Sequence, residues 1–225
     1  MTQITALIAA AGSGQRLGLG PKAFVEVGGR TLLELAASTF LRYGAQLVVA
    51  VPEADAAKAE RLLPRATIVI GGADRQATVR AMLTASHGEV VVVHDVARPF
   101  LTGAVLQRVL AAVAQTGAAT ASLAPADTVV SAADGRVHPR ELLRLVQTPQ
   151  GFDRSVLAEA HRLAAESGFS ATDDAALVRR LGKPVELVQG SPLLAKLTVA
   201  ADLPLFEALH AVWSRQEEAT THADR

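Results

Sequence analysis

The chain contains no cysteine, which excludes disulfide bonds, thiolate metal sites and a cysteine nucleophile. It also has no net charge, since 22 lysine and arginine residues balance 22 aspartate and glutamate residues. This balance argues against a disordered chain, an acidic tail, or a protein that binds nucleic acid over its whole surface. We therefore expect no nucleic-acid partner, and the lack of cysteine fits a cytoplasmic protein.

Long hydrophobic runs are also missing. The opening sequence, MTQITALIAAAGSG, has no basic residue before its apolar stretch and becomes polar after about ten residues. We expect neither a signal peptide nor a membrane span, and no membrane partner. The 225 residues allow one large domain or two small ones, at about 100–200 residues per domain. We expect a single domain over residues 1–225, with a polar, frayed tail at 216–225.

Short β-branched runs alternate with longer stretches of helical periodicity. This alternation is typical of βαβ units and predicts an α/β fold with a mostly parallel, twisted sheet flanked by helices. The run Val90–Val93 is apolar on both faces, as a strand covered by helices on both sides requires. The predicted strands are 4–9, 46–51, 67–70, 89–94, 119–123, 185–188 and 197–199. The predicted helices are 31–43, 53–63, 74–85, 102–115, 154–166, 173–181 and 201–215.

The segment from Pro125 to Phe152 interrupts this alternation. It contains prolines at 125, 139 and 149, and a turn at 133–135 between two short extended stretches. We interpret it as a hairpin-like excursion from the main sheet, at about residues 125–152 and too small to be a domain. An ordinary surface loop is the alternative.

The loop after the first predicted strand has the composition of a phosphate site. In an open parallel sheet, ligands bind beyond the carboxyl ends of the strands. Residues 9–18 read AAAGSGQRLG, and Pro21 and Lys22 follow. Glycines let the backbone approach a ligand closely, and successive N–H groups that face one way bind anions. Arg16 and Lys22 add positive charge, and Lys22 is one of only four lysines. The loop predicts phosphate binding; the alternative is a turn with solvated charges.

Two better-known nucleotide loops fit this segment poorly. A dinucleotide fingerprint would need a third glycine where Leu17 stands, and an acidic residue after a second strand, whereas Glu34 lies in the first predicted helix. A Walker A loop would need Lys-Ser or Lys-Thr directly after Gly18, and neither follows. An NAD-dependent oxidoreductase is therefore disfavoured.

Two further loops after strands carry functional groups. Gly71 and Gly72 allow contact with a flat ring, and Thr78 offers a hydroxyl, although a glycine pair before a helix is equally well explained as a turn. Asp95 and Arg98 follow the most apolar strand. An aspartate at that position facing a phosphate loop can hold a divalent cation between carboxylate and phosphate oxygens. A structural Asp–Arg pair is the alternative.

Histidine chemistry finds no support in the sequence. The six histidines have no metal-ligand spacing, and no G-x-S-x-G motif is present, so zinc and serine-hydrolase sites are disfavoured. We expect His94 to be a packed, hydrogen-bonded residue rather than a base.

Seven blocks occur in an order that resembles one known family. They are AAAGSGQRLG with the following PK, GGADRQATV, VHDVARPF, ADT, QTPQGF, ATDDAALV and the late KLT. Together they resemble the 2-C-methyl-D-erythritol 4-phosphate cytidylyltransferases over roughly residues 4–206. The resemblance implies a Rossmann-like nucleotidyltransferase fold with a protruding β-arm, and a homodimer in which arms are exchanged. It also implies the substrates CTP and a polyol phosphate, with Mg²⁺ or another divalent cation as cofactor.

The resemblance assigns roles to residues by matching position. Arg16 and Lys22 would stabilise the transition state, and Arg140 and Lys196 would position the phosphate nucleophile. The implied nucleotide-binding residues are Ala10, Ala11, Gly12, Gly14, Gly72, Thr78, Asp95 and Ala97. The implied substrate-binding residues are Asp95, Arg98, Thr128, Arg140, Thr172 and Lys196. Asp95 is the candidate metal ligand, together with the CTP phosphates. Thr128 and Arg140 fall in the excursion and would serve the partner's site.

The implied reaction converts CTP and 2-C-methyl-D-erythritol 4-phosphate to 4-diphosphocytidyl-2-C-methyl-D-erythritol and pyrophosphate, in non-mevalonate isoprenoid biosynthesis. Four positions depart from the family pattern: Ala23 replaces the usual Gln, Thr78 the usual Ser, and Leu194-Ala195 an Asn-Ile pair. The alternatives are a cytidylyltransferase for another polyol phosphate such as ribitol 5-phosphate, a sugar-phosphate nucleotidyltransferase for another base, and a nucleotide-binding regulatory module without turnover.

Overall fold

Seven strands form one sheet within the described residues, which are 3–12, 14 and 17–223 of this computed structural model. Their order is β11-β7-β10-β6-β1-β4-β5. β10 is antiparallel to both of its neighbours, and the other neighbouring pairs are parallel, so the predicted mostly parallel sheet is confirmed. The bounds are β1 Ile4–Ala9, β4 Gln46–Val51, β5 Thr67–Ile70, β6 Val90–Asp95, β7 Ala118–Leu123, β10 Leu145–Asp153 and β11 Glu186–Gln189.

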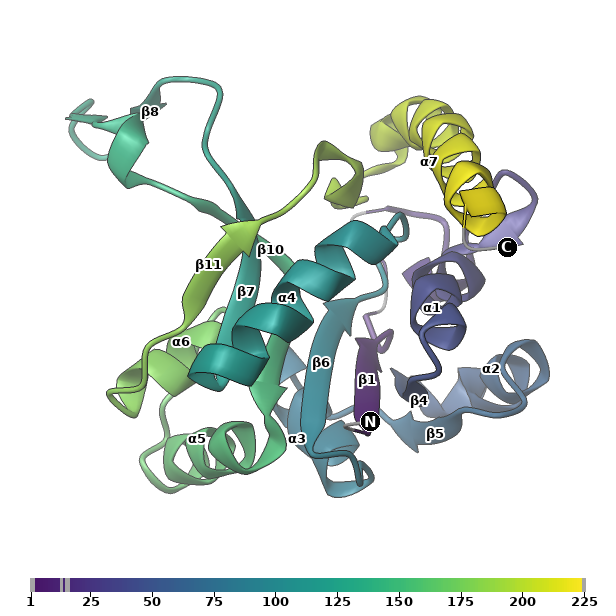
Figure 1. The fold of residues 1–225 in the computed structure, drawn as a ribbon, viewed down its shortest axis with the longest axis horizontal. Coiled ribbons are helices and arrows are strands. Elements are labelled where there is room, and N and C mark those ends of the chain that lie inside the picture. The colour runs from purple at the N-terminus through teal and green to yellow at the C-terminus, as the bar shows by residue number, and fades with distance from the viewer. Residues whose placement is uncertain (1–2, 13, 15–16, 224–225) are drawn as a thin grey trace.

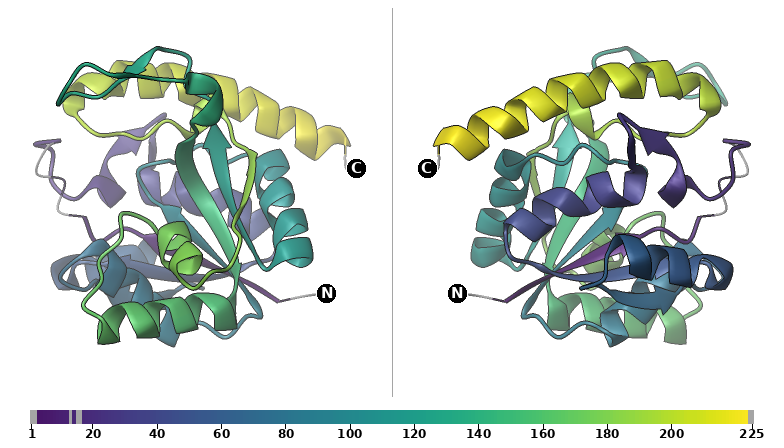
Figure 2. Two further views of the ribbon diagram at one scale, coloured as in Figure 1. Left: turned by 90° about the vertical axis from the view of Figure 1, so that its left-hand side faces the viewer. Right: turned by 90° about the vertical axis from the view of Figure 1, so that its right-hand side faces the viewer.

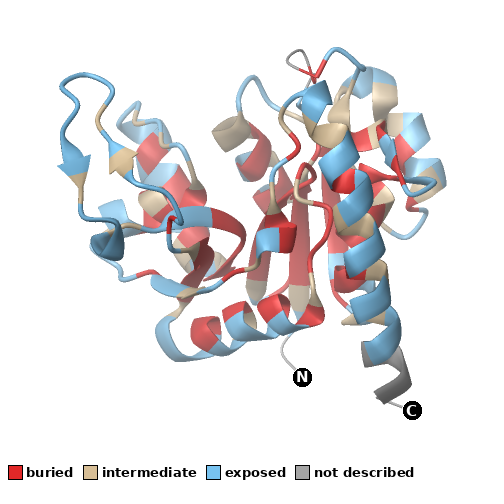
Figure 3. Ribbon diagram, turned by 90° about the horizontal axis from the view of Figure 1, so that it is seen from above, coloured by how far each residue is buried: buried red, intermediate tan, exposed pale blue. Residues whose placement is uncertain are grey.

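Helices cover both faces of the sheet, as Figures 1 and 2 show. One face carries α1 (Leu32–Arg42), α2 (Ala56–Leu62), α4 (Gly103–Thr116) and α7 (Leu203–Ala223). The other carries α3 (Arg75–Thr84), α5 (Arg154–Glu166) and α6 (Asp174–Arg180). Leu7 and Ile8 are neighbours in β1, yet they belong to different buried clusters. The central strands are therefore buried on both faces, as Figure 3 shows.

α1 follows local sequence signals closely. Thr31 caps its start: the Glu34 N–H donates to Thr31 Oγ1 at 3.3 Å, and the Thr31 N–H donates to Glu34 Oε2 at 2.9 Å. This reciprocal pair satisfies two amides that have no partner inside the helix. Gly44 follows the last turn with a φ of +67°, which favours glycine, and so ends the helix where the sequence predicts.

The predicted strand at 197–199 does not form. The segment is irregular, and the N–H groups of Thr198 and Val199 donate to Asp202 Oδ2 at 2.8 and 3.1 Å. Because a side chain already satisfies these amides, they make no sheet ladder. The Leu197 N–H instead donates to the Ala97 carbonyl at 2.9 Å, which ties this segment to the loop after β6.

The excursion is real but shorter than predicted. Residues 124–144, which we call the arm, contain β8 (Val129–Val130), β9 (Val137–His138) and the 3₁₀ turn η3 (Arg140–Leu142). The predicted end at Phe152 was wrong, because Leu145–Asp153 forms β10 inside the main sheet. A register shift between Val146 and Gln150 accommodates Pro149, which cannot donate a ladder hydrogen bond. Figure 1 shows the arm projecting away from the body.

The C-terminal helix is longer than expected. α7 continues past the predicted end at residue 215 to Ala223, so the prediction of a frayed tail from 216 was wrong for most of that segment. Trp213 donates from Nε1 to the Leu101 carbonyl at 2.9 Å, and Glu217 forms an ion pair with Arg42 of α1. These contacts fix the helix on the body. Within the described residues, no helix is both long and apolar enough to cross a membrane.

Candidate active site

A cavity of about 620 Å³ lies beyond the carboxyl ends of β1, β5 and β6. It gathers predicted site residues from separate loops: Ala11, Gly12, Gly14, Lys22, Gly72, Thr78, Asp95, Ala97 and Lys196. Other predicted residues do not line it: Ala10, Arg98, Thr128, Arg140 and Thr172. Arg16 lies outside the described residues. The predicted convergence of the loops after the strands is therefore confirmed for the first loop, the glycine pair and the end of β6.

The first loop turns sharply at Gly14. Its φ is +68°, and a Cβ there would lie 2.0 Å from the Gly20 carbonyl oxygen, so only glycine fits. Gly12 faces open space, since a Cβ there would meet nothing within 4 Å. Ala10 lies beneath the loop, where its N–H donates to the Ala50 carbonyl at 2.9 Å. The backbone of Gly12 is thus accessible to a ligand, whereas the amide of Ala10 is already used by the sheet.

The glycine pair brings the second loop against the first. A Cβ on Gly71 would lie 2.2 Å from Ala11 Cβ, and one on Gly72 would lie 2.6 Å from Ala77 Cβ. The Thr78 hydroxyl donates to the Asp74 carbonyl at 2.8 Å and accepts from the Gly72 N–H at 3.0 Å. Thr78 therefore shapes the loop through its backbone, a contribution that the sequence interpretation had not specified.

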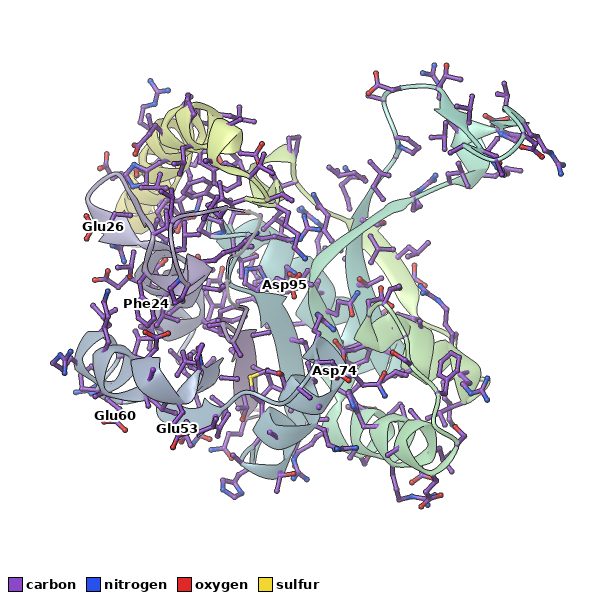
Figure 4. The ribbon with its side chains drawn as sticks, turned by 180° about the vertical axis from the view of Figure 1, so that it is seen from behind. Phe24, Glu26, Glu53, Glu60, Asp74 and Asp95 are labelled. Carbon is purple, nitrogen blue, oxygen red and sulfur yellow. The ribbon has the colours of Figure 1, made fainter. Side chains whose placement is uncertain are left out.

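Asp95 occupies the end of β6, and Figure 4 labels it at the centre of the molecule. Lys196 Nζ donates to Asp95 Oδ2 at 2.7 Å, and Arg75 Nε donates to Asp95 Oδ1 at 3.2 Å. Burial alone would raise the pKa of this carboxyl, but the charges of Arg75 and Lys196 hold it well below its usual range. Asp95 is therefore ionised and compensated by two cations.

The Arg98 N–H donates to the Asp95 carbonyl at 3.0 Å, but among the described ion pairs the Arg98 side chain has none with the Asp95 carboxylate, so the alternative of an Asp95–Arg98 structural pair was wrong. Arg98 Nη1 donates instead to the Leu194 carbonyl at 2.5 Å. Its Nε is buried and has no hydrogen-bond partner among the described residues, and burial lowers the pKa of the guanidinium. The side chain lies beside the cavity and holds the segment before Lys196 in place.

Lys22 and Lys196 meet at the same late segment. Lys22 opens the 3₁₀ turn η1 (Lys22–Phe24), and its Nζ donates to the Leu197 carbonyl at 2.8 Å and to the Thr198 carbonyl at 3.3 Å. Both lysines line the cavity, which places two of the chain's four lysines at one site. This is the concentration of positive charge that a phosphate site requires.

His94 is neutral and hydrogen-bonded. Because the Arg98 carbonyl can only accept, His94 Nε2 donates to it at 2.9 Å, and Nδ1 accepts from the Thr148 hydroxyl at 3.1 Å. Burial lowers the pKa of His94 to about 4, despite the nearby Asp95. The prediction of a packed, hydrogen-bonded histidine is confirmed.

Three predicted substrate residues do not line the cavity. Thr128 and Arg140 are on the arm, where Arg140 Nη1 donates to the Ala126 carbonyl at 2.6 Å. Thr172 is exposed in the segment before α6. Within one chain, none of these residues lines the cavity with Lys196. The contribution of Thr128 and Arg140 to a partner's site stays a prediction.

Sequence interpretation missed two charged residues that the structure brings to the site. Arg75, the first residue of α3, bridges Asp95 and Asp174, and its Nη1 lies 2.7 Å from Asp174 Oδ2. Both residues lie within blocks quoted above, GGADRQATV and ATDDAALV. The available signal was that each is the second residue of a predicted helix, one that carries Thr78 and one that follows Thr172, but neither was selected.

A glycine-rich turn and a lysine-lined cavity lie at the carboxyl edge of a Rossmann-like sheet, and together with the family match they identify the chain as a nucleotidyltransferase. The family model IspD, 2-C-methyl-D-erythritol 4-phosphate cytidylyltransferase, matches residues 4–211. The enzyme of that name from Thermus thermophilus is 49% identical over 215 residues, covering 94% of this chain and 99% of the relative. The Deinococcus radiodurans enzyme is 48% identical over 210 residues, covering 91% and 88%.

A solved structure agrees with the sequence comparison. The crystal structure of the Thermus thermophilus enzyme has a TM-score of 0.82 at 44% identity, covering 91% of this chain and 98% of that one. The chain belongs to the 2-C-methyl-D-erythritol 4-phosphate cytidylyltransferase family. The expected Rossmann-like nucleotidyltransferase fold is thereby confirmed.

Proposed function

We propose that the protein transfers the cytidylyl group of CTP to 2-C-methyl-D-erythritol 4-phosphate, releasing pyrophosphate in non-mevalonate isoprenoid biosynthesis. Membership of the family over residues 4–211 carries this conclusion. The cavity that brings Lys22 and Lys196 to the glycine-rich loop supports it. Ribitol 5-phosphate as substrate is not favoured, because the relatives at 48–49% identity bear the methylerythritol phosphate name.

The nucleophile needs no general base. A phosphate monoester has a second pKa near 6, so the phosphate group is already largely dianionic at neutral pH and its oxygen is nucleophilic without further deprotonation. This oxygen forms a bond to the α-phosphorus of CTP while the bond from that phosphorus to the bridging oxygen breaks, and pyrophosphate leaves. A buried neutral histidine such as His94 is consistent with this chemistry, because no proton has to be removed from the nucleophile.

Fixed cations provide the remaining catalysis. Two anions must meet, and negative charge gathers on the α-phosphate and the leaving pyrophosphate. Lys22, at the cavity wall, stabilises this charge together with Arg16 of the first loop. Lys196 lines the same cavity from another loop and orients the substrate phosphate.

The residues present fit a divalent cation that is shared with the nucleotide. Among the described residues, no group of three or more histidine, cysteine, aspartate or glutamate side chains could hold a metal. Asp95 would supply one carboxylate oxygen, and the CTP phosphates and water the rest, which is the usual manner for Mg²⁺. When bound, the cation would neutralise charge on the triphosphate.

The arm supports a homodimer. Its two strands have two residues each, and a single isolated hairpin is at best marginally stable in water. Val130, Val137 and Leu142 expose 54%, 60% and 79% of their surface. Apolar side chains gathered on one projecting segment mark an interaction surface. In this proposal the arm packs on a second copy and delivers Arg140 and Thr128 to the partner's cavity.

The cysteine-free sequence supports a cytoplasmic location.

The reaction can be tested directly. The protein is incubated with CTP, Mg²⁺ and 2-C-methyl-D-erythritol 4-phosphate, and the CDP-alcohol is detected by mass spectrometry. Parallel reactions use ribitol 5-phosphate, or ATP, GTP or UTP in place of CTP, and compare pyrophosphate release. Faster release with ribitol 5-phosphate, or with another nucleotide, would overturn the proposed substrate assignment.

A further inference from the structure

A line of charged side chains leads from the cavity into the protein interior. Lys196 Nζ donates to Asp95 at 2.7 Å, Asp95 accepts from Arg75 at 3.2 Å, and Arg75 donates to Asp174 at 2.7 Å. His161 Nε2 then lies 3.0 Å from the second oxygen of Asp174. These five groups come from the late loop, β6, α3, α6 and α5. Asp95 is thus shared between two cations, and Arg75 between two carboxylates.

The inner end of this line is fully buried. Asp174 is 1% exposed and His161 is 2% exposed. Burial alone would raise the pKa of Asp174, but the hydrogen bond from His161 and the charge of Arg75 keep that pKa below its usual value. Burying an ionised carboxylate is costly unless its partners compensate it. Asp174 does not line the cavity and has no direct part in the transfer reaction. We therefore look for its role in its ion pair with Arg75.

Arg75 determines what happens to Asp95 when Lys196 moves. A lysine that is to bind a substrate phosphate loosens its contact with Asp95, and the charge of this largely buried carboxylate is then balanced only by Arg75 and by any divalent cation that takes the place of Lys196. Arg75 remains on the other oxygen of Asp95 and keeps that charge compensated. Asp174 holds the far side of the same guanidinium, with Arg75 Nη1 2.7 Å from Asp174 Oδ2.

We propose that Arg75 is a positioning residue, anchored by Asp174, that compensates Asp95 so that Lys196 can pass from Asp95 to the phosphate of the polyol substrate. The inference rests on the proposed function and on the role proposed there for Lys196. Only a guanidinium can perform this task, because Nε and Nη1 reach two carboxylates in different directions. A single ammonium group has no such fork.

A neighbouring contact indicates that the start of α3 serves the substrate side of the site. Gln76 Nε2 donates to the Phe169 carbonyl at 3.1 Å, and the Ala171 N–H donates to Gln76 Oε1 at 3.1 Å. Arg75 and Gln76 together therefore fix the segment from Phe169 to Asp174, which carries Thr172, a predicted substrate contact. Loss of Arg75 should disturb binding of the polyol phosphate more than binding of CTP.

The test compares Arg75→Gln, Arg75→Lys and Asp174→Asn with the wild-type protein. Arg80→Gln is the matched control, because Arg80 lies on the same helix, is exposed, and does not line the cavity. Each variant is assayed for kcat and for the KM of both substrates, and its fold is checked by circular dichroism and thermal melting. We expect the KM for the polyol phosphate to rise about ten- to hundredfold in all three variants, as loss of a charged hydrogen bond implies. The KM for CTP should not rise, and Arg80→Gln should match the wild type.

A double variant tests whether Arg75 acts through Asp95. In an Asp95→Asn background there is no carboxylate charge at position 95 to compensate, so adding Arg75→Gln should raise the KM for the polyol phosphate by much less than it does in the wild-type background, with only the contact to Asp174 left to lose. Additive effects would contradict the proposal. So would wild-type behaviour of Arg75→Lys, or a rise in the KM for CTP alone, which would make Arg75 a nucleotide ligand.

Two further outcomes are distinguishable. If Arg75→Gln fails to fold, the nearly isosteric Asp174→Asn and the charge-conserving Arg75→Lys decide the matter. A wild-type protein that forms no CDP-alcohol would contradict the proposed function, and this inference with it. An active wild type with unchanged KM values in these variants would contradict this inference alone.

Discussion

Lys196 and Asp95 are 101 residues apart in the sequence, yet Lys196 Nζ lies 2.7 Å from Asp95 Oδ2 at the carboxyl edge of the sheet. The contact joins the end of β6 to the irregular segment that follows η4 (Pro192–Leu194). Lys22 reaches the carbonyls of that same segment from the first loop. Three parts of the chain thus bring opposite charges into one cavity, and the predictions below separate their contributions.

Removing the charge of Lys22 should slow the chemical step. We expect Lys22→Ala to lower kcat by about 10²–10³-fold at saturating substrates, because a fixed cation at the transition state is lost. The same loss is expected for Arg16→Met, although Arg16 lies outside the described residues. Lys183→Ala, at an exposed lysine away from the cavity, is the control. Near-normal turnover in Lys22→Ala would remove Lys22 from this role.

The first loop should tolerate no side chain at Gly14. Gly14→Ala adds a Cβ that would lie 2.0 Å from the Gly20 carbonyl oxygen, in addition to the left-handed backbone. Gly18→Ala is a matched control, since its φ of +71° is similar but a Cβ there meets nothing within 4 Å. The backbone alone should cost about 1–2 kcal/mol in both variants. We expect Gly14→Ala to lose more stability in urea unfolding, and also affinity for CTP in calorimetry. Equal effects of the two substitutions would contradict this account.

The parallel part of the sheet could be predicted from the sequence because its strands are short β-branched runs between helices. β1, β4 and β5 have the predicted bounds, and β6, β7 and β11 differ by one residue at one or both ends. β10 could not be predicted, since Pro149 makes a central strand improbable by local rules and only its pairing with β6 and β7 overrides them.

The site shows the same limit. Lys22 and Asp95 could be predicted because they stand in distinctive loops after strands, whereas Lys196 was assigned only through the resemblance of its KLT block to the family. Arg75 and Asp174 were missed because an ion pair between residues 99 apart leaves no local pattern. Long-range contacts of this kind depend on how α3 and α6 pack together, which periodicity alone does not specify.

Acidification should destabilise the protein through His94. The folded state holds this ring neutral until the pH falls to about 4, because burial lowers its pKa, whereas the unfolded chain binds a proton near pH 6.5. The unfolded state therefore binds more protons between these values, and the free energy of unfolding should fall by up to about 1.4 kcal/mol per pH unit from this group. Urea unfolding of wild type and His94→Gln at pH 7, 5.5 and 4.5 measures the difference. Parallel pH profiles would contradict the assignment to His94.

Mixing two inactive variants should reveal whether the arm completes a partner's site. Arg140→Ala and Lys22→Ala proteins should each have low activity alone. If Arg140 acts across the dimer, a heterodimer has one site with its own Lys22 and the partner's intact arm. Random exchange makes half of the dimers mixed, each with one intact site of two, so about a quarter of wild-type activity should return.

The structure supplies the control for this experiment. Lys22 and Lys196 line one cavity of the same chain, so Lys22→Ala mixed with Lys196→Ala has no means of rebuilding a complete site if both lysines act within their own chain. Subunit exchange is followed in both mixtures with differently tagged proteins. Recovery in the Arg140 mixture only would place Arg140 in the neighbouring subunit's reaction. Failure of both mixtures despite exchange would mean that the arm does not complete the partner's site. In that case Arg140 would act within its own chain, and each subunit of the heterodimer would lack either Arg140 or Lys22.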